Sequence, residues 1–91
     1  MSPKFELGKI VQTPGALEAL ERSGQDASFF LEKHAGGDWG DVAADDQAEN
    51  ERALLAGGRL VSLFMTLRGD VILIITEPDR SITTVLTPDE Y

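Results

Sequence analysis

The chain contains no cysteine and no long hydrophobic run, and each absence excludes a class of protein. Without cysteine there can be no disulfide bond or thiolate metal site, which is compatible with a reducing compartment. The longest uninterrupted apolar stretch, Val71–Ile75, is far too short to span a bilayer. The first residues, Met1–Glu6, lack the apolar segment of a secretory signal peptide. These absences predict a cytoplasmic protein of a bacterial cell.

Basic residues are also scarce. Eight Lys and Arg residues face sixteen Asp and Glu residues, which gives a net charge of −8 and a pI near 4.4. Affinity for phosphate groups grows with the number of cations that displace counterions, so direct binding of nucleic acid or of an anionic membrane is not expected. A basic partner complements this charge. The alternative is that the charge only keeps a small protein soluble.

The length of 91 residues predicts one domain over residues 1–91, and its first elements are marked by local signals. Residues 5–12 alternate apolar and polar side chains, which predicts a strand. Thr13 and Pro14 predict a helix start, because threonine caps free backbone N–H groups and proline fits the first turn. Gly24 should end this helix. Its buried stripe should consist of Ala16, Leu17 and Leu20.

Two further helices are expected before the last third of the chain. Asp26 should open a short helix that ends at Gly36-Gly37, anchored to the core by Phe29, Phe30 and Leu31. A third helix should run over residues 42–56, with a thin apolar side made of Ala44, Ala48, Leu54 and Leu55. Such a helix packs by one narrow side and leaves most of its surface in water.

The last third of the chain has the pattern of strands. Residues 59–68 alternate, and Gly69-Asp70 fits a two-residue hairpin loop. Val71–Ile75 is apolar on both faces, so this strand should lie in the centre of a sheet, and a further strand is expected over residues 81–87. The order of elements predicts an α+β fold. It should have an antiparallel sheet of about four strands, with a C-terminal three-stranded meander and two to three helices packed on one face.

Carboxylates are concentrated in one segment, which is the candidate partner-binding site: Asp38, Asp41, Asp45, Asp46, Glu49 and Glu51. Acidic residues stabilise a helix N-terminus, which explains the first of them but not the last two. Asp41, Asp45 and Glu49 recur at every fourth position, so a helix would place them about 6 Å apart. That row has roughly the spacing of phosphates along a nucleic-acid strand, which predicts a DNA-mimicking surface. A solvated helix face is the alternative interpretation.

Neither a metal nor another cofactor is expected. An EF-hand loop requires oxygen ligands at alternate positions, a central glycine and a glutamate at the twelfth position. Neither Asp38-Trp39-Gly40 nor Asp41-Val42-Ala43 begins such a loop. The acidic segment therefore predicts a protein-binding surface and no calcium site.

Trp39 lies between two glycines and two aspartates, and it is the only tryptophan. Tryptophan is usually mostly buried, which favours a lid over the core. An exposed Trp39 would instead be an apolar anchor for a partner, so it joins the six carboxylates in the candidate site. In the later turn, Glu77, Asp79 and Arg80 predict local salt bridges of little energetic weight.

No catalytic residue is assigned. His34 is the only histidine and the simplest candidate for acid–base chemistry at neutral pH, but no serine or cysteine nucleophile has a local signature. The enzymatic alternative is a small metal-independent ribonuclease or toxin that uses His34 with Glu77, Arg80 and Thr84. A net charge of −8 would repel its RNA substrate.

Five segments together resemble a family of small proteins encoded on phages, plasmids and integrative elements of bacteria. They are Thr13–Leu20, Gly37–Asp41, Gly57–Leu60, Ile74–Ser81 and Leu86–Tyr91. Most members of that family have no assigned activity, some carry a restriction-system label, and the group includes proteins proposed as anti-CRISPR proteins against type I systems. The resemblance implies a mobile-element origin and supplies no catalytic residue.

Three hypotheses follow from these observations. The first is a non-enzymatic inhibitor of a host-defence complex, anti-CRISPR or anti-restriction, which binds a basic nucleic-acid-binding surface of a Cas or restriction complex through the acidic segment. The second is the small nuclease or toxin. The third is an accessory protein of the mobile element with no defence role, either monomeric or homodimeric.

Overall fold

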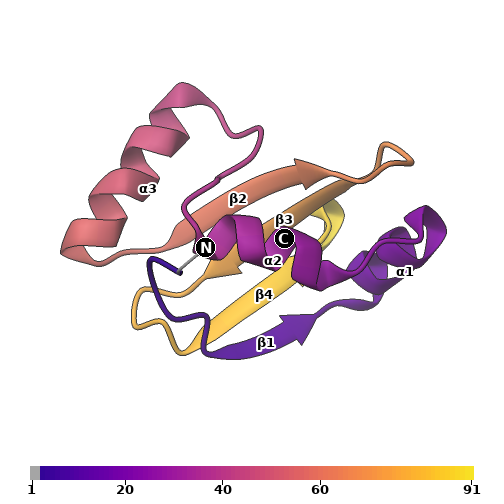
Figure 1. The fold of residues 1–91 in the computed structure, drawn as a ribbon, viewed down its shortest axis with the longest axis horizontal. Helices are drawn as coiled ribbons and strands as arrows, with labels where there is room; N and C mark the ends of the chain where they lie inside the picture. The colour runs from indigo at the N-terminus through magenta and orange to yellow at the C-terminus, as the bar shows by residue number, and fades with distance from the viewer. Residues whose placement is uncertain (1–2) are drawn as a thin grey trace.

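A computed structural model describes residues 3–91 of the chain (Figure 1). It confirms the α+β class, with three α-helices and a four-stranded sheet. The elements follow one another as β1 (Lys9–Gln12), α1 (Pro14–Ser23), α2 (Ala27–Ala35), α3 (Ala44–Ala56), β2 (Leu60–Met65), β3 (Val71–Thr76), β4 (Ile82–Leu86) and the 3₁₀ helix η1 (Pro88–Glu90).

The strands lie in the order β1-β4-β3-β2. Strands β2, β3 and β4 form the expected antiparallel meander, and β3 has a neighbour on each side, as its apolar sequence predicts. Strand β1 runs parallel to β4, so the prediction of a purely antiparallel sheet is wrong. The alternation of side chains is the same in either direction of a strand, and the pattern in residues 5–12 therefore could not fix the direction.

The start of β1 depends on a close approach to the residue before β4. Gly8 has a φ of 66°, and a Cβ at this position would lie 2.3 Å from the carbonyl oxygen of Ser81. The next residue, Lys9, donates its backbone N–H to that same oxygen at 2.9 Å. Glycine is therefore required where the chain enters the sheet, and the strand predicted from residue 5 begins only at Lys9.

The predicted helix boundaries are largely confirmed. The Thr13 hydroxyl accepts the N–H of Ala16 at 3.3 Å, Pro14 occupies the first turn, and Gly24 ends α1 with a φ of 68°. The Asp26 carboxylate caps α2. Helix α3 begins two residues later than predicted and ends before Gly57.

Helix α1 receives a second cap from the end of the chain. The Glu90 carboxylate accepts the backbone N–H of Gly15 at 2.9 Å and the hydroxyl of Thr13 at 2.5 Å. The bond from Thr13, followed by the backbone N–H of Thr87, holds the pKa of Glu90 at about 2. A residue near the end of the described chain thus caps the N-terminus of α1, and no local sequence pattern predicts this contact.

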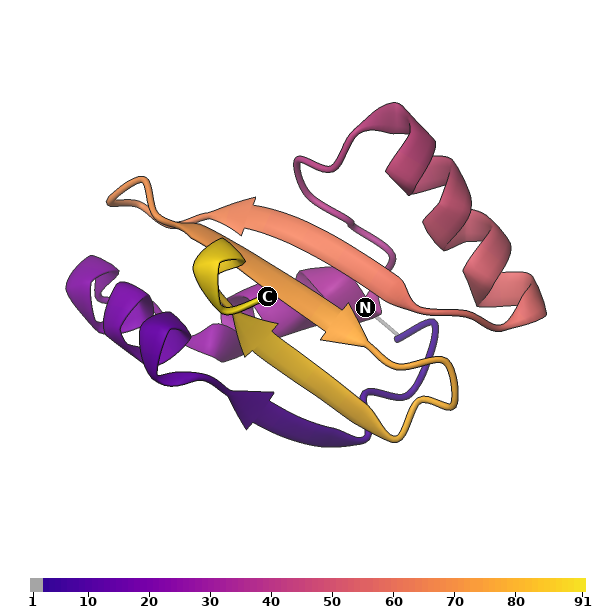
Figure 2. The same ribbon diagram turned by 180° about the vertical axis from the view of Figure 1, so that it is seen from behind.

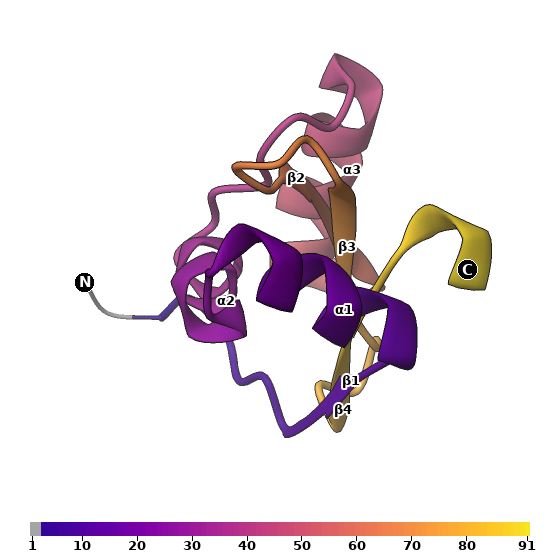
Figure 3. The same cartoon turned by 90° about the vertical axis from the view of Figure 1, so that its right-hand side faces the viewer.

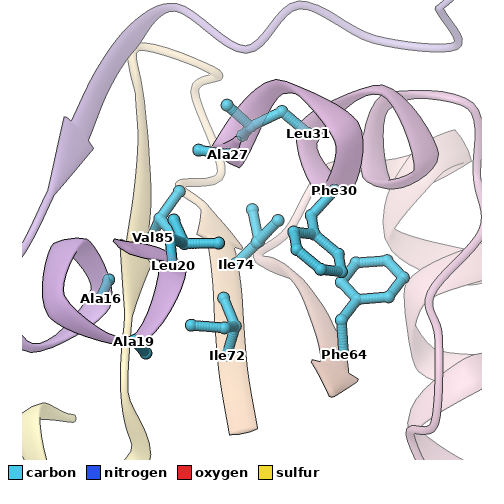
Figure 4. Close-up of a cluster of buried hydrophobic side chains, with 10 residues drawn as sticks. All are labelled: Ala16, Ala19, Leu20, Ala27, Phe30, Leu31, Phe64, Ile72, Ile74 and Val85. Carbon is cyan, nitrogen blue, oxygen red and sulfur yellow. The ribbon is translucent and has the colours of Figure 1, made fainter. Parts of the chain in front are cut away.

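The main core lies between the sheet and the helices α1 and α2, which cover the same face of the sheet (Figure 3). Figure 4 shows Phe30 of α2 against Phe64 of β2, with Ile72 and Ile74 of β3 pointing toward the helices. Two residues predicted to be buried are exposed. Leu17, assigned to the buried stripe of the first helix, is 45% exposed, and Phe29, assigned as a core anchor of the second, is 52% exposed. The full cluster comprises Ala16, Ala19, Leu20, Ala27, Phe30, Leu31, Phe64, Ile72, Ile74 and Val85.

Within residues 3–91, no α-helix covers the opposite face of the sheet (Figure 2). Seen from behind, the strands are in view and only η1 crosses in front of β3 (Figure 2). The loop between β2 and β3 is longer than the predicted two-residue loop, because the strands end at Met65 and resume at Val71. It is closed by a backbone bond of 2.8 Å from Thr66 to Asp70.

Candidate functional site

The acidic segment, residues 38–51, lies beyond the β2 edge of the sheet. It runs from the end of α2 through a loop into α3, which stands apart from α1 and α2 (Figure 1). The segment contains six carboxylates and no Lys or Arg, so the rest of the chain carries ten acidic and eight basic residues. All six acidic residues are exposed, as the prediction of a solvated or partner-binding surface requires.

The predicted row of three carboxylates is only partly formed. Helix α3 begins at Ala44, so Asp45 and Glu49 share a helical row but Asp41 lies outside it. The reason is a backbone interaction with β2, in which Asp41 N–H donates to the Leu63 carbonyl at 2.7 Å. The Leu63 N–H in turn donates to the Trp39 carbonyl at 3.0 Å. Asp41 is therefore held as part of a short bridge on the sheet edge.

Gly40 makes this bridge possible. Its φ is 71°, and a Cβ would lie 2.0 Å from the Leu63 carbonyl oxygen. Any other residue would push the loop away from β2, because an L side chain is strained at this φ and has no space here. The glycine thus places the start of the acidic segment against the sheet.

The six carboxylates differ in how strongly they are held. Asp38 lies 3.8 Å from the Lys33 ammonium nitrogen, and Glu49 pairs with Arg52. The Glu51 carboxylate accepts a bond from the indole of Trp39, and the other three have no hydrogen bond or ion pair within residues 3–91. Those three, Asp41, Asp45 and Asp46, surround the start of α3.

Trp39 is a lid and not an exposed anchor. Only 5% of its surface is exposed, and its ring stacks on Phe5 with centroids 6.2 Å apart. The ring also meets the edge of His34 at 5.7 Å. Its indole N–H donates to the Glu51 carboxylate at 2.8 Å. The interpretation of Trp39 as an accessible partner contact is therefore wrong, because the core and the Glu51 carboxylate satisfy both its apolar and its polar parts.

Helix α3 is attached to the sheet through a small apolar cluster, in which Ala53 lies with Trp39 and Leu60, and through one amide side chain. Asn50 is buried and takes the place of a neighbouring strand: its side-chain N–H donates to the Val61 carbonyl at 2.8 Å, and its oxygen accepts the Val61 N–H at 3.1 Å. The predicted apolar side of α3 is wrong at three of its four positions. Ala44 and Ala48 are exposed and Leu55 is 93% exposed, whereas Leu54 is partly buried and Asn50 and Ala53 are the buried positions.

The C-terminal end of α3 is closed by Arg80. Its guanidinium donates to the carbonyl oxygens of Ala53 at 3.0 Å and Gly58 at 2.5 Å. Arg80 itself has a φ of 62°, unusual for a residue with a side chain. The predicted local salt bridge in this turn is wrong, since the Glu77 carboxylate pairs with Arg59 at 3.6 Å and Arg80 reaches only the Glu77 backbone carbonyl.

His34 lies in a buried chain of hydroxyl groups. It has no exposed surface, its Nδ1 is 2.6 Å from Ser62 Oγ, and its Nε2 is 2.8 Å from Thr76 Oγ1. Thr76 is bonded at 2.8 Å to Thr83, whose hydroxyl donates to the Leu7 carbonyl at 2.7 Å. Burial, and next the positive charge of Arg80, lowers the pKa of His34 to about 4, so the ring is neutral at pH 7.

The enzymatic alternative is only partly brought together: the charge of Arg80 acts on His34, but Thr84 does not reach the imidazole. The strand register places Thr83 beside Thr76 on the helix-covered face, so the adjacent Thr84 points to the other face, away from His34. Both ring nitrogens of His34 are already bonded to hydroxyl groups. The arrangement can orient a neutral imidazole but gives it no path to a substrate.

The polar residues that hold this region have a weak signal in the sequence. Ser62, Thr76 and Thr83 interrupt otherwise apolar faces of their strands, which indicates a buried polar partner above the sheet. The partner could have been identified as His34, the lone histidine of a neighbouring helix. Asn50 has no such signal, because asparagine on a polar helix is normally solvated.

Comparisons of the chain with family models, with curated proteins and with solved structures found no match. Within residues 3–91, no helix has the length and apolar character needed to cross a membrane. The same residues contain no group of three or more His, Asp or Glu side chains that could hold a metal ion.

Proposed function

We propose that the chain is a non-enzymatic binding protein whose acidic segment docks on a basic, nucleic-acid-binding surface of a partner. The observation that carries this proposal is the concentration of charge in residues 38–51, where six exposed carboxylates occur without one basic residue. The remaining 77 residues are nearly balanced, with ten acidic against eight basic. An electrostatic field of one sign on one side of a small protein steers and orients an oppositely charged partner.

The carboxylates best placed to meet such a partner are Asp41, Asp45 and Asp46. They are exposed and have no internal cation within the described residues, so binding would not have to break an existing pair. Glu49 and Glu51 would contribute less, because Arg52 and Trp39 already hold them. The geometry therefore concentrates the proposed contact at the start of α3.

A host-defence complex is the kind of partner we propose, with the chain acting as an anti-CRISPR or anti-restriction inhibitor from a mobile element. Complexes that capture foreign DNA present basic channels, and a small acidic protein can occupy such a channel in place of the phosphate backbone. The charge distribution supports the basic channel. The resemblance to mobile-element proteins supports the choice of host-defence complexes.

The test is competition with DNA, using two matched triple variants. The first variant replaces Asp41, Asp45 and Asp46 with asparagine. The second variant replaces Glu18, Glu21 and Glu32, which are exposed on α1 and α2, with glutamine. Both raise the net charge by the same amount. Complexes captured from a bacterial lysate are identified by mass spectrometry, purified, and titrated with each variant with and without duplex DNA.

We expect the first variant to bind at least about tenfold more weakly and the second to stay within about threefold of the wild type. DNA should displace the wild type, and rising salt should weaken binding mainly through a slower on-rate. Equal affinities of the two variants, or binding that DNA does not displace, would show that the acidic segment is not the docking surface.

A further inference from the structure

The two edges of the sheet differ in how their backbone groups are satisfied. At the β2 edge, Asn50 binds both backbone groups of Val61, and the loop before α3 binds both backbone groups of Leu63. Proteins normally cover an edge strand, because its free N–H and C=O groups can pair with any extended chain. Within residues 3–91, no loop or side chain is hydrogen-bonded to the outer edge of β1. This edge is therefore open to a further strand.

The hydrogen bonds of β1 to its neighbour show which of its groups are free. The N–H groups of Lys9 and Thr13 donate to carbonyl oxygens on the β4 side, at 2.9 Å and 3.0 Å. Backbone groups alternate in direction along a strand, so the N–H and C=O groups of Ile10 and Gln12 point away from β4. Both residues are exposed, and β1 borders the sheet in Figure 1 and Figure 2. The edge offers two donors and two acceptors.

An apolar groove lies beside this edge, between residues 3–10 and α2. Its volume is about 750 Å³, in the range of ligand sites. Ile10 belongs to both the edge and the groove, because it is in register with the buried Thr83 and so points to the helix-covered face. The apolar side chains that line the groove are Pro3, Leu7, Ile10, Phe29, Leu31 and Ala35.

We propose that the edge of β1 binds an extended peptide segment of another protein as a fifth strand of the sheet. An antiparallel strand would exchange two hydrogen bonds with Ile10 and two with Gln12. Its residue opposite Ile10 then points into the groove beside α2, and the residues before and after it point to the other face. The backbone bonds hold the segment, and the groove selects an apolar side chain at this one position.

The charges around the groove select the residues that flank this apolar position. Glu32 and Asp38 line the groove together with one cation, Lys33. The Lys33 ammonium group is already engaged, 3.8 Å from the Asp38 carboxylate and 5.2 Å from the ring centroid of Phe29. The Glu32 carboxylate is exposed and has no ion pair within residues 3–91. Basic residues on either side of the apolar one are therefore favoured, and acidic ones are disfavoured.

This edge is separate from the acidic segment, since β1 and β2 lie at opposite borders of the sheet. The inference does not depend on the proposed function. A basic peptide is also attracted to the acidic segment, so the experiment uses the full chain with asparagine at Asp41, Asp45 and Asp46. Short random peptides displayed on phage are selected on this variant, and the enriched peptides are synthesised. Their binding to the variant and to the wild type is followed by NMR of the backbone amides.

We expect the enriched peptides to share an apolar residue between basic ones. Hydrogen exchange at the amides of Ile10 and Gln12 should slow at least about tenfold in the complex, and exchange at Lys9, which is already bonded to the β4 side, should change little. Two matched substitutions test the groove: Phe29→Ala within it and Leu17→Ala on α1 outside it, at positions 52% and 45% exposed. The first should weaken binding at least about tenfold, and the second should stay within about threefold of the parent.

The inference is overturned if no enriched peptide protects the amides of Ile10 and Gln12, or if the two substitutions weaken binding equally. Protection of these amides that rises with the concentration of the chain alone would assign the edge to a second copy, and would also overturn it. Because the peptides are selected without the three aspartates, a failure here leaves the docking of the acidic segment untouched. Failure of that docking likewise leaves the peptide site in place.

Discussion

Helices α1 and α2 lie on the sheet through the main apolar core, whereas α3 is held at the sheet edge by a small apolar cluster around Ala53 and by side chains that hydrogen-bond to backbone groups. Leu20 and Phe30 are buried in the main core, but α3 presents Asn50 to β2 and receives Arg80 at its C-terminal end. Apolar burial requires a hydrophobic stripe, and hydrogen bonding to a strand edge requires one well-placed amide. The second mode of attachment leaves the remaining surface of α3 free to carry charge.

The largest expected effect breaks the apolar attachment. Ile74→Asp places a carboxylate at a position with no exposed surface, under α1 and α2, and should cost several kcal/mol, comparable to the whole stability of a small domain. The matched change on α3 is Leu55→Asp, at 93% exposure, which should leave the melting temperature almost unchanged. Thermal unfolding followed by circular dichroism measures both. Similar melting temperatures for the two variants would contradict this account of the core.

A pH titration sharpens the comparison, because α2 also has a polar contact with the sheet. The pKa of His34 is about 4 in the folded protein and 6.5 in the unfolded chain, so the unfolded chain binds a proton first as pH falls. The stabilisation by neutral His34 is therefore complete above pH 6.5 and is lost as pH falls toward 4, by about 3 kcal/mol in total. Urea unfolding at pH 7 and pH 5 measures this loss.

The control for this titration is His34→Gln, which can still hydrogen-bond to Ser62 and Thr76 but does not titrate. Its stability at pH 7 should be lower, and its change between pH 7 and pH 5 should be smaller than that of the wild type. An equal pH dependence in both proteins would mean that another group accounts for the acid sensitivity.

The smallest expected effect breaks the attachment of α3. Asn50→Ala leaves the N–H and carbonyl of Val61 without their partner, at a cost of about 2 kcal/mol because water can reach part of the edge. Hydrogen exchange should speed up in α3 and at Val61 and leave β3 protected. Gln47→Ala, on the exposed side of the same helix, is the control. Faster exchange throughout the sheet would show that α3 is part of the main core and not a separately attached helix.

Local signals were sufficient for most of the elements but not for their arrangement. Thr13, Gly24 and Asp26 act on backbone groups within a few residues, so the sequence predicts the helix ends well. The direction of β1 depends on β4, about 70 positions later, and the alternation of its side chains carries no information about it. The α+β class therefore followed from the order of elements, and the parallel pair did not.

The same distinction applies to the candidate site. Exposure of the six carboxylates follows from their chemistry and was predicted correctly. The break in the row at Asp41 was missed, since it depends on a bridge to Leu63 that forms only when the sheet is complete. Trp39 was correctly favoured as a lid over the core. Its hydrogen bond to Glu51 shows that this carboxylate, predicted to bind a partner, also holds Trp39 in place.

The parallel pairing of β1 with β4 also sets the order in which the protein can form during its synthesis. Helices α1 and α2 can form early, but the sheet face that they cover belongs to β2, β3 and β4, which leave the ribosome later. Until Ile82–Leu86 has been synthesised, β1 has no neighbour, and the apolar sides of both helices face solvent or a chaperone. Contacts between residues so distant in the chain form slowly. The nascent chain therefore spends most of its synthesis without its core, and folding is completed after translation has passed β4.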